Sequence, residues 1–110
     1  MAAPRSTDVI QGTLDMLILK SVSLEPTHGF DITKRIEQIS SGVFKVNPGS
    51  LLVAFQRLER EGLIEPEWRA TENNRQAKYY GITAAGKRRL KHETHDWQLR
   101  SAAIARLLEA

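Results

Sequence analysis

The chain has 110 residues, 41% hydrophobic and 26% charged, with a formal net charge of +3, and these ordinary globular proportions exclude disordered and collagen-like chains. It contains no cysteine, which excludes disulfide scaffolds, thiolate metal sites and cysteine nucleophiles. It has no apolar run near the roughly 18 residues that span a membrane and no apolar stretch typical of a signal peptide, so we expect a cytoplasmic protein without a membrane partner.

Two helices are predicted in the N-terminal part of the chain. A helical apolar pattern runs from Val9 to Leu24, with Ser6, Thr7 or Asp8 to cap it and Pro26 to end it. After the connector Thr27–Gly29, a second helix is predicted from about Gly29 to Ser40. Its expected apolar face holds Phe30, Ile32, Ile36 and Ile39.

A third helix and a β-hairpin follow. Val43–Val46 suits a short strand or an extended link. Asn47 and Pro48 form a strong helix start, because Asn caps free N–H groups and proline suits the first helical position. This helix is predicted over about residues 48–61, with Gly62 as its left-handed C-cap. Two strands at about 63–82 then flank a polar, basic tip, and Pro66 predicts that the first strand is either an edge strand or a bulged one.

The last predicted helix is long. Thr83 caps it, and it runs from about Ala84 to Leu108, roughly 37 Å at about 1.5 Å per residue. Its apolar seam repeats at spacings of four and three, and a helix of this length extends beyond so small a domain, so we expect it to pair with a second copy. The expected dimerisation residues are Leu90, Trp97, Ile104, Leu107 and Leu108.

This order of elements predicts a mainly α fold with a small β-hairpin: a winged helix-turn-helix over residues 1–83, then a dimerisation helix over 84–110 in the same compact unit. In that architecture the third helix enters the major groove of DNA and the hairpin is the wing. Residues 71–91 hold six Lys or Arg and one acidic residue, a cluster that suits phosphate and equally suits a solvated surface.

Seven short stretches, in this order and spacing, make the chain resemble the PadR family of bacterial transcriptional regulators. They are Gln11–Leu19, His28–Phe30, Gly49–Leu51, Arg57–Glu59, Glu72–Arg75, Lys78–Tyr80 and Thr83–Gly86. The single C-terminal helix is similar to that of the compact subgroup. The resemblance implies a homodimeric, cytoplasmic DNA-binding regulator, usually a repressor.

The third helix departs from the family pattern at two positions. Family members usually have Leu-Tyr-Pro-Ala-Leu there, whereas this chain has Leu52 and Val53 in place of the tyrosine and proline. The change affects the side expected to face DNA. It leaves open a rival function, in which the apolar Leu52/Val53 surface binds another protein.

The candidate DNA contacts fall into two groups. Base contacts are expected from Ser50, Leu52, Val53 and Gln56, because glutamine pairs with adenine and apolar side chains touch the thymine methyl, although Leu52 and Val53 also suit a broader core stripe. The operator of a two-fold dimer should be a pseudo-palindrome. Backbone contacts are expected from Arg57, Arg60, Asn73, Asn74, Arg75 and Lys78. For Arg57, an ion pair with Glu61 is an equal alternative.

The sequence has few candidate residues for an effector site, a metal site or a catalytic site. Trp97 suits packing, or alternatively stacking on a planar apolar effector at the dimer interface. His92 and His95 lack further ligands at metal-binding spacing, so we expect no metal and no other cofactor. The sequence has no glycine-rich phosphate loop and no nucleophile elbow, so we do not expect an enzyme.

Overall fold

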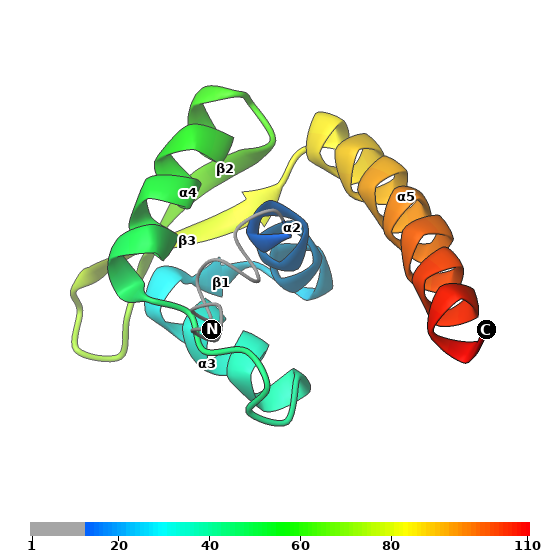
Figure 1. Cartoon of the computed structure of the whole chain (residues 1–110). Helices are drawn as coiled ribbons and strands as arrows, with labels where there is room; N and C mark the ends of the chain where they lie inside the picture. Colours follow the sequence, from blue (N-terminus) through cyan, green and yellow to red (C-terminus); the bar gives the residue numbers. More distant parts are fainter. Residues whose placement is uncertain (1–12) are drawn as a thin grey trace.

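The computed structural model describes residues 13–110 (Figure 1). The predicted start of the first helix and its capping residues lie outside this range, and the side chain of Phe30 is not among the described parts. The helices are α2 (Leu14–Leu24), α3 (Gly29–Ile39), α4 (Pro48–Arg60) and α5 (Ala84–Glu109), and the strands are β1 (Thr27–His28), β2 (Ile64–Ala70) and β3 (Gln76–Ile82). The predicted helices and hairpin are therefore confirmed within the described range.

The described residues form a three-stranded antiparallel sheet in the order β1-β3-β2. Strand β2 lies at an edge, which is one of the two alternatives that Pro66 predicts, and Pro66 faces Tyr80 of β3. The prediction of a plain connector at Thr27–Gly29 was wrong, because Thr27 and His28 pair with Tyr80 and Tyr79. A strand of two residues has no alternation to detect, so its pairing depends on where β3 comes to lie. Val43–Val46 is a link without strand structure.

The core lies between α2, α3, α4 and the inner face of the sheet. Its largest fully buried side chains are Ile18, Leu19, Ile32, Leu58 and Ile64. Ile39, predicted on the apolar face of the second helix, is exposed. It is the last residue of α3, and the chain turns away there through Ser41 and Gly42, both in the left-handed region at φ 53° and 79°.

The start of α5 is joined tightly to the end of α4. The Thr83 hydroxyl donates to the Gly62 carbonyl at 2.6 Å and accepts from the Gly86 amide at 3.0 Å, so one side chain binds both segments. The Thr83 amide donates to the Leu63 carbonyl at 3.1 Å. Gly86 is buried against that same carbonyl, and a Cβ at Gly86 would overlap the Leu63 oxygen. Glycine is thus required for α5 to approach this closely.

Beyond its first turns, α5 projects from the rest of the chain. Ala85 and Leu90 pack partly buried against the core, whereas Ile104, Leu107 and Leu108 are exposed. Figure 1 shows α5 standing apart from α4, with α2 between them. The molecule is consequently elongated, with extents of 58 × 31 × 22 Å.

Substitution of Gly86 by alanine should destabilise the fold by about 1–3 kcal/mol, because the new methyl group overlaps a backbone carbonyl. In an open helical position the same substitution stabilises, by roughly 0.5–1 kcal/mol. Urea denaturation followed by circular dichroism measures the change, and the exposed Ala102→Gly variant gives the helix-propensity effect alone. A Gly86→Ala variant as stable as the unmodified chain would contradict the close packing.

Candidate nucleic-acid interface

Helix α4 has a buried face and an exposed face. Asn47 caps it, its side-chain oxygen accepting from the amides of Gly49 at 2.8 Å and Ser50 at 3.4 Å. The buried face holds Leu51, Ala54, Phe55 and Leu58. The exposed face holds Ser50, Leu52, Val53, Gln56 and Arg60. All four predicted base contacts therefore share one accessible side of this helix.

The apolar pair Leu52 and Val53 lies outside the core of the chain. Leu52 is 57% exposed and Val53 60% exposed. The alternative in which both belong to a broader core stripe is therefore wrong for the single chain. A surface of this kind suits contact with thymine methyl groups or with another protein.

The wing, formed by β2 and β3, ends in a tight turn whose residues have distinct roles. Asn74 adopts the left-handed region at φ 58°, which asparagine tolerates better than most residues, and its amide donates to the Thr71 carbonyl at 2.9 Å. The backbone conformation of the turn therefore accounts for asparagine at position 74 without any contact to DNA. Asn73 and Arg75 are exposed at the tip, which projects past the start of α4 at the lower left of Figure 1.

Two predicted phosphate-binding cations are held by carboxylates. Arg57 pairs with Asp15 of α2, so the predicted alternative partner Glu61 was wrong. Sequence spacing on α4 favours Glu61, whereas the packing of α2 against α4 brings Asp15 closer. The Lys78 amine lies 3.6 Å from a carboxylate oxygen of Glu59 on α4. Arg60 and Arg75 have no ion pair with any residue of the described range 13–110.

Burial changes the titration of Asp15. It raises the pKa of the Asp15 carboxyl above its ordinary value of 3.8, and the nearby Arg57 only partly opposes this. Glu93 of α5 raises the pKa of Asp15 further, and Arg89 lowers it. Arg89 pairs with Glu93 at 2.5 Å. Charges on α4, α2 and α5 are therefore electrostatically coupled at this point.

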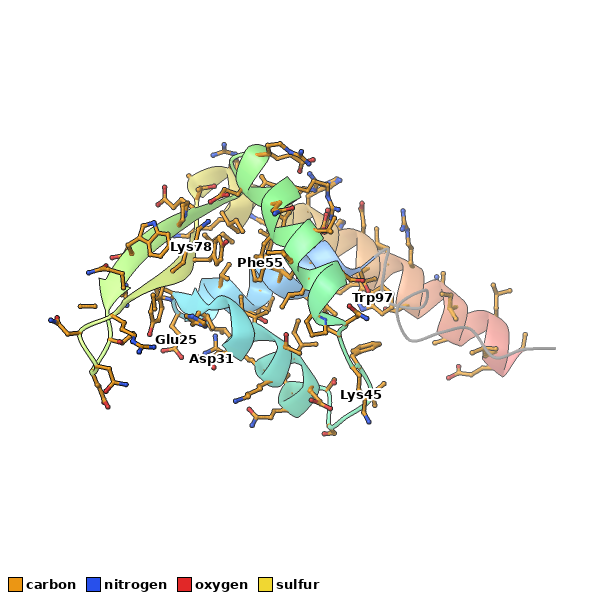
Figure 2. The ribbon with its side chains drawn as sticks, turned by 90° about the vertical axis from the view of Figure 1, so that its left-hand side faces the viewer. Glu25, Asp31, Lys45, Phe55, Lys78 and Trp97 are labelled. Atoms are coloured by element: carbon orange, nitrogen blue, oxygen red, sulfur yellow. The ribbon has the colours of Figure 1, made fainter. Side chains whose placement is uncertain are left out.

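An aromatic stack joins the wing to α4. The rings of Phe55 and Tyr80 are parallel within 5°, with centroids 4.6 Å apart. In Figure 2, Phe55 and Lys78 lie where α4 meets the sheet. An open groove of about 440 Å³ lies beside this stack, lined mostly by carbon from residues that include Leu51, Leu52 and Tyr80. The stack fixes the wing relative to the exposed face of α4.

A second hollow, of about 340 Å³, lies between α2 and α5. Trp97 lines it and is 47% exposed. Its other walls include Met16 and the charged residues Arg89, Glu93 and Arg100. Trp97, the predicted effector contact, therefore borders this hollow. The walls of the hollow are more polar than a planar apolar ligand requires.

One histidine of α5 has an acidic partner on the same helix. His92 pairs with Asp96 at 3.3 Å, and residues 13–110 contain no group of three or more potential metal ligands. Within the same residues, no helix is both long and apolar enough to cross a membrane.

Two acidic residues that the sequence analysis did not select, Asp15 and Glu59, hold candidate DNA-binding cations. Asp15 pairs with Arg57, and Glu59 pairs with Lys78.

The geometry defines a winged helix-turn-helix, in which an exposed helix face lies beside a two-stranded wing. The model of the Transcriptional regulator PadR-like family matches residues 18–92. The chain therefore belongs to the PadR-like family of transcriptional regulators, as its motifs indicate.

Three individual proteins are similar to this chain over most of its length. A transcriptional regulator from Clostridium thermocellum is 29% identical with a TM-score of 0.82, covering 94% of this chain and 97% of its own. A PadR-like transcriptional regulator from Bacillus cereus is 26% identical with a TM-score of 0.82, covering 93% and 97%. A protein of Lysinibacillus sphaericus is 31% identical over 91 residues, which are 83% of this chain and 84% of that protein.

Stability should respond to acid through Asp15. Because the pKa of Asp15 is raised in the folded chain, the folded chain takes up this proton at higher pH than the unfolded chain. The unfolding free energy of the unmodified protein, minus that of Asp15→Asn, should therefore increase as the pH falls through the raised pKa toward 3.8. Urea titrations between about pH 7 and pH 4 measure this difference. A difference that decreases on acidification would show that the ion pair outweighs burial.

Proposed function

We propose that this PadR-like regulator binds duplex DNA sequence-specifically as a homodimer and represses transcription from a pseudo-palindromic operator. The observation that carries the proposal is the exposed face of α4, with Ser50 and Gln56 accessible beside a wing that has Arg75 at its tip. Base edges in the major groove are read by side chains of this kind, and the backbone by cations.

The dimer is proposed from the surface of α5. Trp97, Ile104, Leu107 and Leu108 are all exposed in the single chain, and Leu108 is 81% exposed. So many large apolar side chains along one projecting helix are costly in water unless a partner covers them. Leu90, the remaining predicted dimerisation residue, packs partly against its own core and would anchor the seam.

The proposed contacts divide by role. Ser50, Leu52, Val53 and Gln56 face the bases. Arg60, Asn73, Asn74 and Arg75 contact the backbone or the minor groove. Arg57 and Lys78 are already paired with carboxylates, so either would have to exchange its partner to bind phosphate.

Two further roles, binding of another protein and binding of a small effector, are each supported by one observation. The exposed Leu52 and Val53 beside an apolar groove favour binding of another protein as the second candidate function. Steep weakening of DNA binding by salt would distinguish the first function from this one. The cavity beside Trp97 supports a small effector with a flat apolar part.

Substitutions at the two kinds of contact should differ in effect. Gln56→Ala should weaken binding to the operator by about 1–3 kcal/mol and relax base preference at one position. Arg75→Ala should weaken binding to all duplexes and reduce the salt slope by about one unit for each phosphate that the arginine neutralises. Fluorescence anisotropy at several salt concentrations measures both effects. The proposed surface is wrong if neither variant differs from the unmodified protein.

Disruption of the α5 seam should remove the dimer. The unmodified protein is expected at twice the mass of one chain in light scattering, and Ile104→Asp with Leu108→Asp should give monomers, because a carboxylate in an apolar seam is strongly disfavoured. Ala102→Asp, which adds one carboxylate off the seam, should remain dimeric. Single-chain mass for the unmodified protein at micromolar concentration would refute the dimer.

A further inference from the structure

We propose that Glu59 is a specificity-determining residue, which holds Lys78 against the recognition helix α4 and keeps this cation from the DNA phosphates. The inference rests on the proposed DNA-binding function. It concerns two side chains that face each other across the junction between wing and helix, and it assigns Lys78 a role different from the phosphate contact that its position in the wing predicts.

The position of the Lys78 amine is defined from two sides. It lies 3.6 Å from Glu59 Oε1 and 5.3 Å from the centre of the Tyr80 ring. Tyr80 is itself buried and stacked on Phe55, so the ring beneath the amine has a fixed position. The side chains of Lys78 and Glu59 are 36% and 33% exposed, which leaves the pair accessible to a competing anion.

The electrostatics of Lys78 agree with this geometry. Its contact with the Tyr80 side chain raises the pKa of the Lys78 amine, Glu59 raises it further, and burial opposes both. The amine is therefore charged when it lies between the ring and the carboxylate. A phosphate that binds it must displace Glu59, and it must also approach the carboxylate that is left without a partner.

The consequence is a change in the balance between affinity and specificity. Phosphate contacts strengthen binding to every sequence equally, whereas base contacts distinguish sequences. A carboxylate that removes one phosphate contact per subunit lowers affinity for random DNA, and recognition then depends more on Ser50, Gln56 and their neighbours. Glu59 also fixes the wing to α4, so the wing and the base-reading face approach DNA in one orientation.

The test compares Glu59→Gln with Glu61→Gln. Both substitutions remove one carboxylate near the end of α4, and Glu61 has no ion pair within residues 13–110. Binding is measured over a range of salt concentrations on a random-sequence duplex and on an operator selected from a random pool. Glu59→Gln should bind the random duplex several-fold more tightly, and its salt slope should be steeper by about 0.9 for each subunit. Glu61→Gln should keep the slope of the unmodified protein.

Lys78→Met supplies the complementary result. In the unmodified background it should leave the salt slope unchanged, since Lys78 is bound to Glu59. In the Glu59→Gln background it should return the steeper slope to the original value. Circular dichroism verifies that each variant is folded, and the Lys78→Met single variant tests the inference even if Glu59→Gln does not fold.

Two results would overturn the inference while leaving the proposed function intact. One is an unchanged slope in Glu59→Gln. The other is a shallower slope in Lys78→Met alone, which would place Lys78 on phosphate in the unmodified protein. Absence of salt-dependent binding to any duplex by the unmodified protein would instead refute the proposed function, and the inference with it.

Discussion

The close approach of α5 to the end of α4 is the constraint on which the rest of the structure depends. Gly86 lies against the Leu63 carbonyl where no side chain fits, and Thr83 bonds to both Gly62 and Gly86. These contacts determine the direction in which the long helix leaves the winged helix. In the proposed dimer, that direction determines the distance between the two recognition helices.

A second set of contacts orients the wing. The stacked rings of Phe55 and Tyr80 join α4 to β3, and the Lys78–Glu59 pair lies beside them. The same region has cations whose charge is already partly compensated, since Arg57 is held by Asp15. The surface near α4 is therefore less positive than the number of its basic residues indicates. Binding of DNA would then depend strongly on shape and base contacts.

Local signals in the sequence were sufficient for much of the fold. Asn47 with Pro48, Gly62 and Thr83 mark helix ends through their own backbone chemistry, and each lies where it was predicted. Pro66 likewise indicated an edge strand or a bulged one, and β2 is an edge strand. These features depend on a few neighbouring residues, so they can be recognised without knowledge of the tertiary structure.

Contacts between distant segments could not be predicted in the same way. The pairing of Thr27 with Tyr80, of Arg57 with Asp15 and of Lys78 with Glu59 each joins separate elements. The sequence offered a DNA phosphate or Glu61 as the partner of Arg57, whereas the packing of α2 against α4 brings Asp15 to it. For the interface, the sequence predicted which residues lie on the exposed face of α4. It did not show which of the cations near that face are paired with carboxylates.

The most direct test of this account is the spacing of half-sites in DNA selected by the unmodified protein from a random duplex pool. A fixed junction and a two-fold dimer predict inverted half-sites at one sharply defined spacing, about 34 Å or one helical turn between their centres. Enriched half-sites at several unrelated spacings would contradict a fixed direction for α5. The absence of paired half-sites would contradict the dimeric arrangement of the recognition helices.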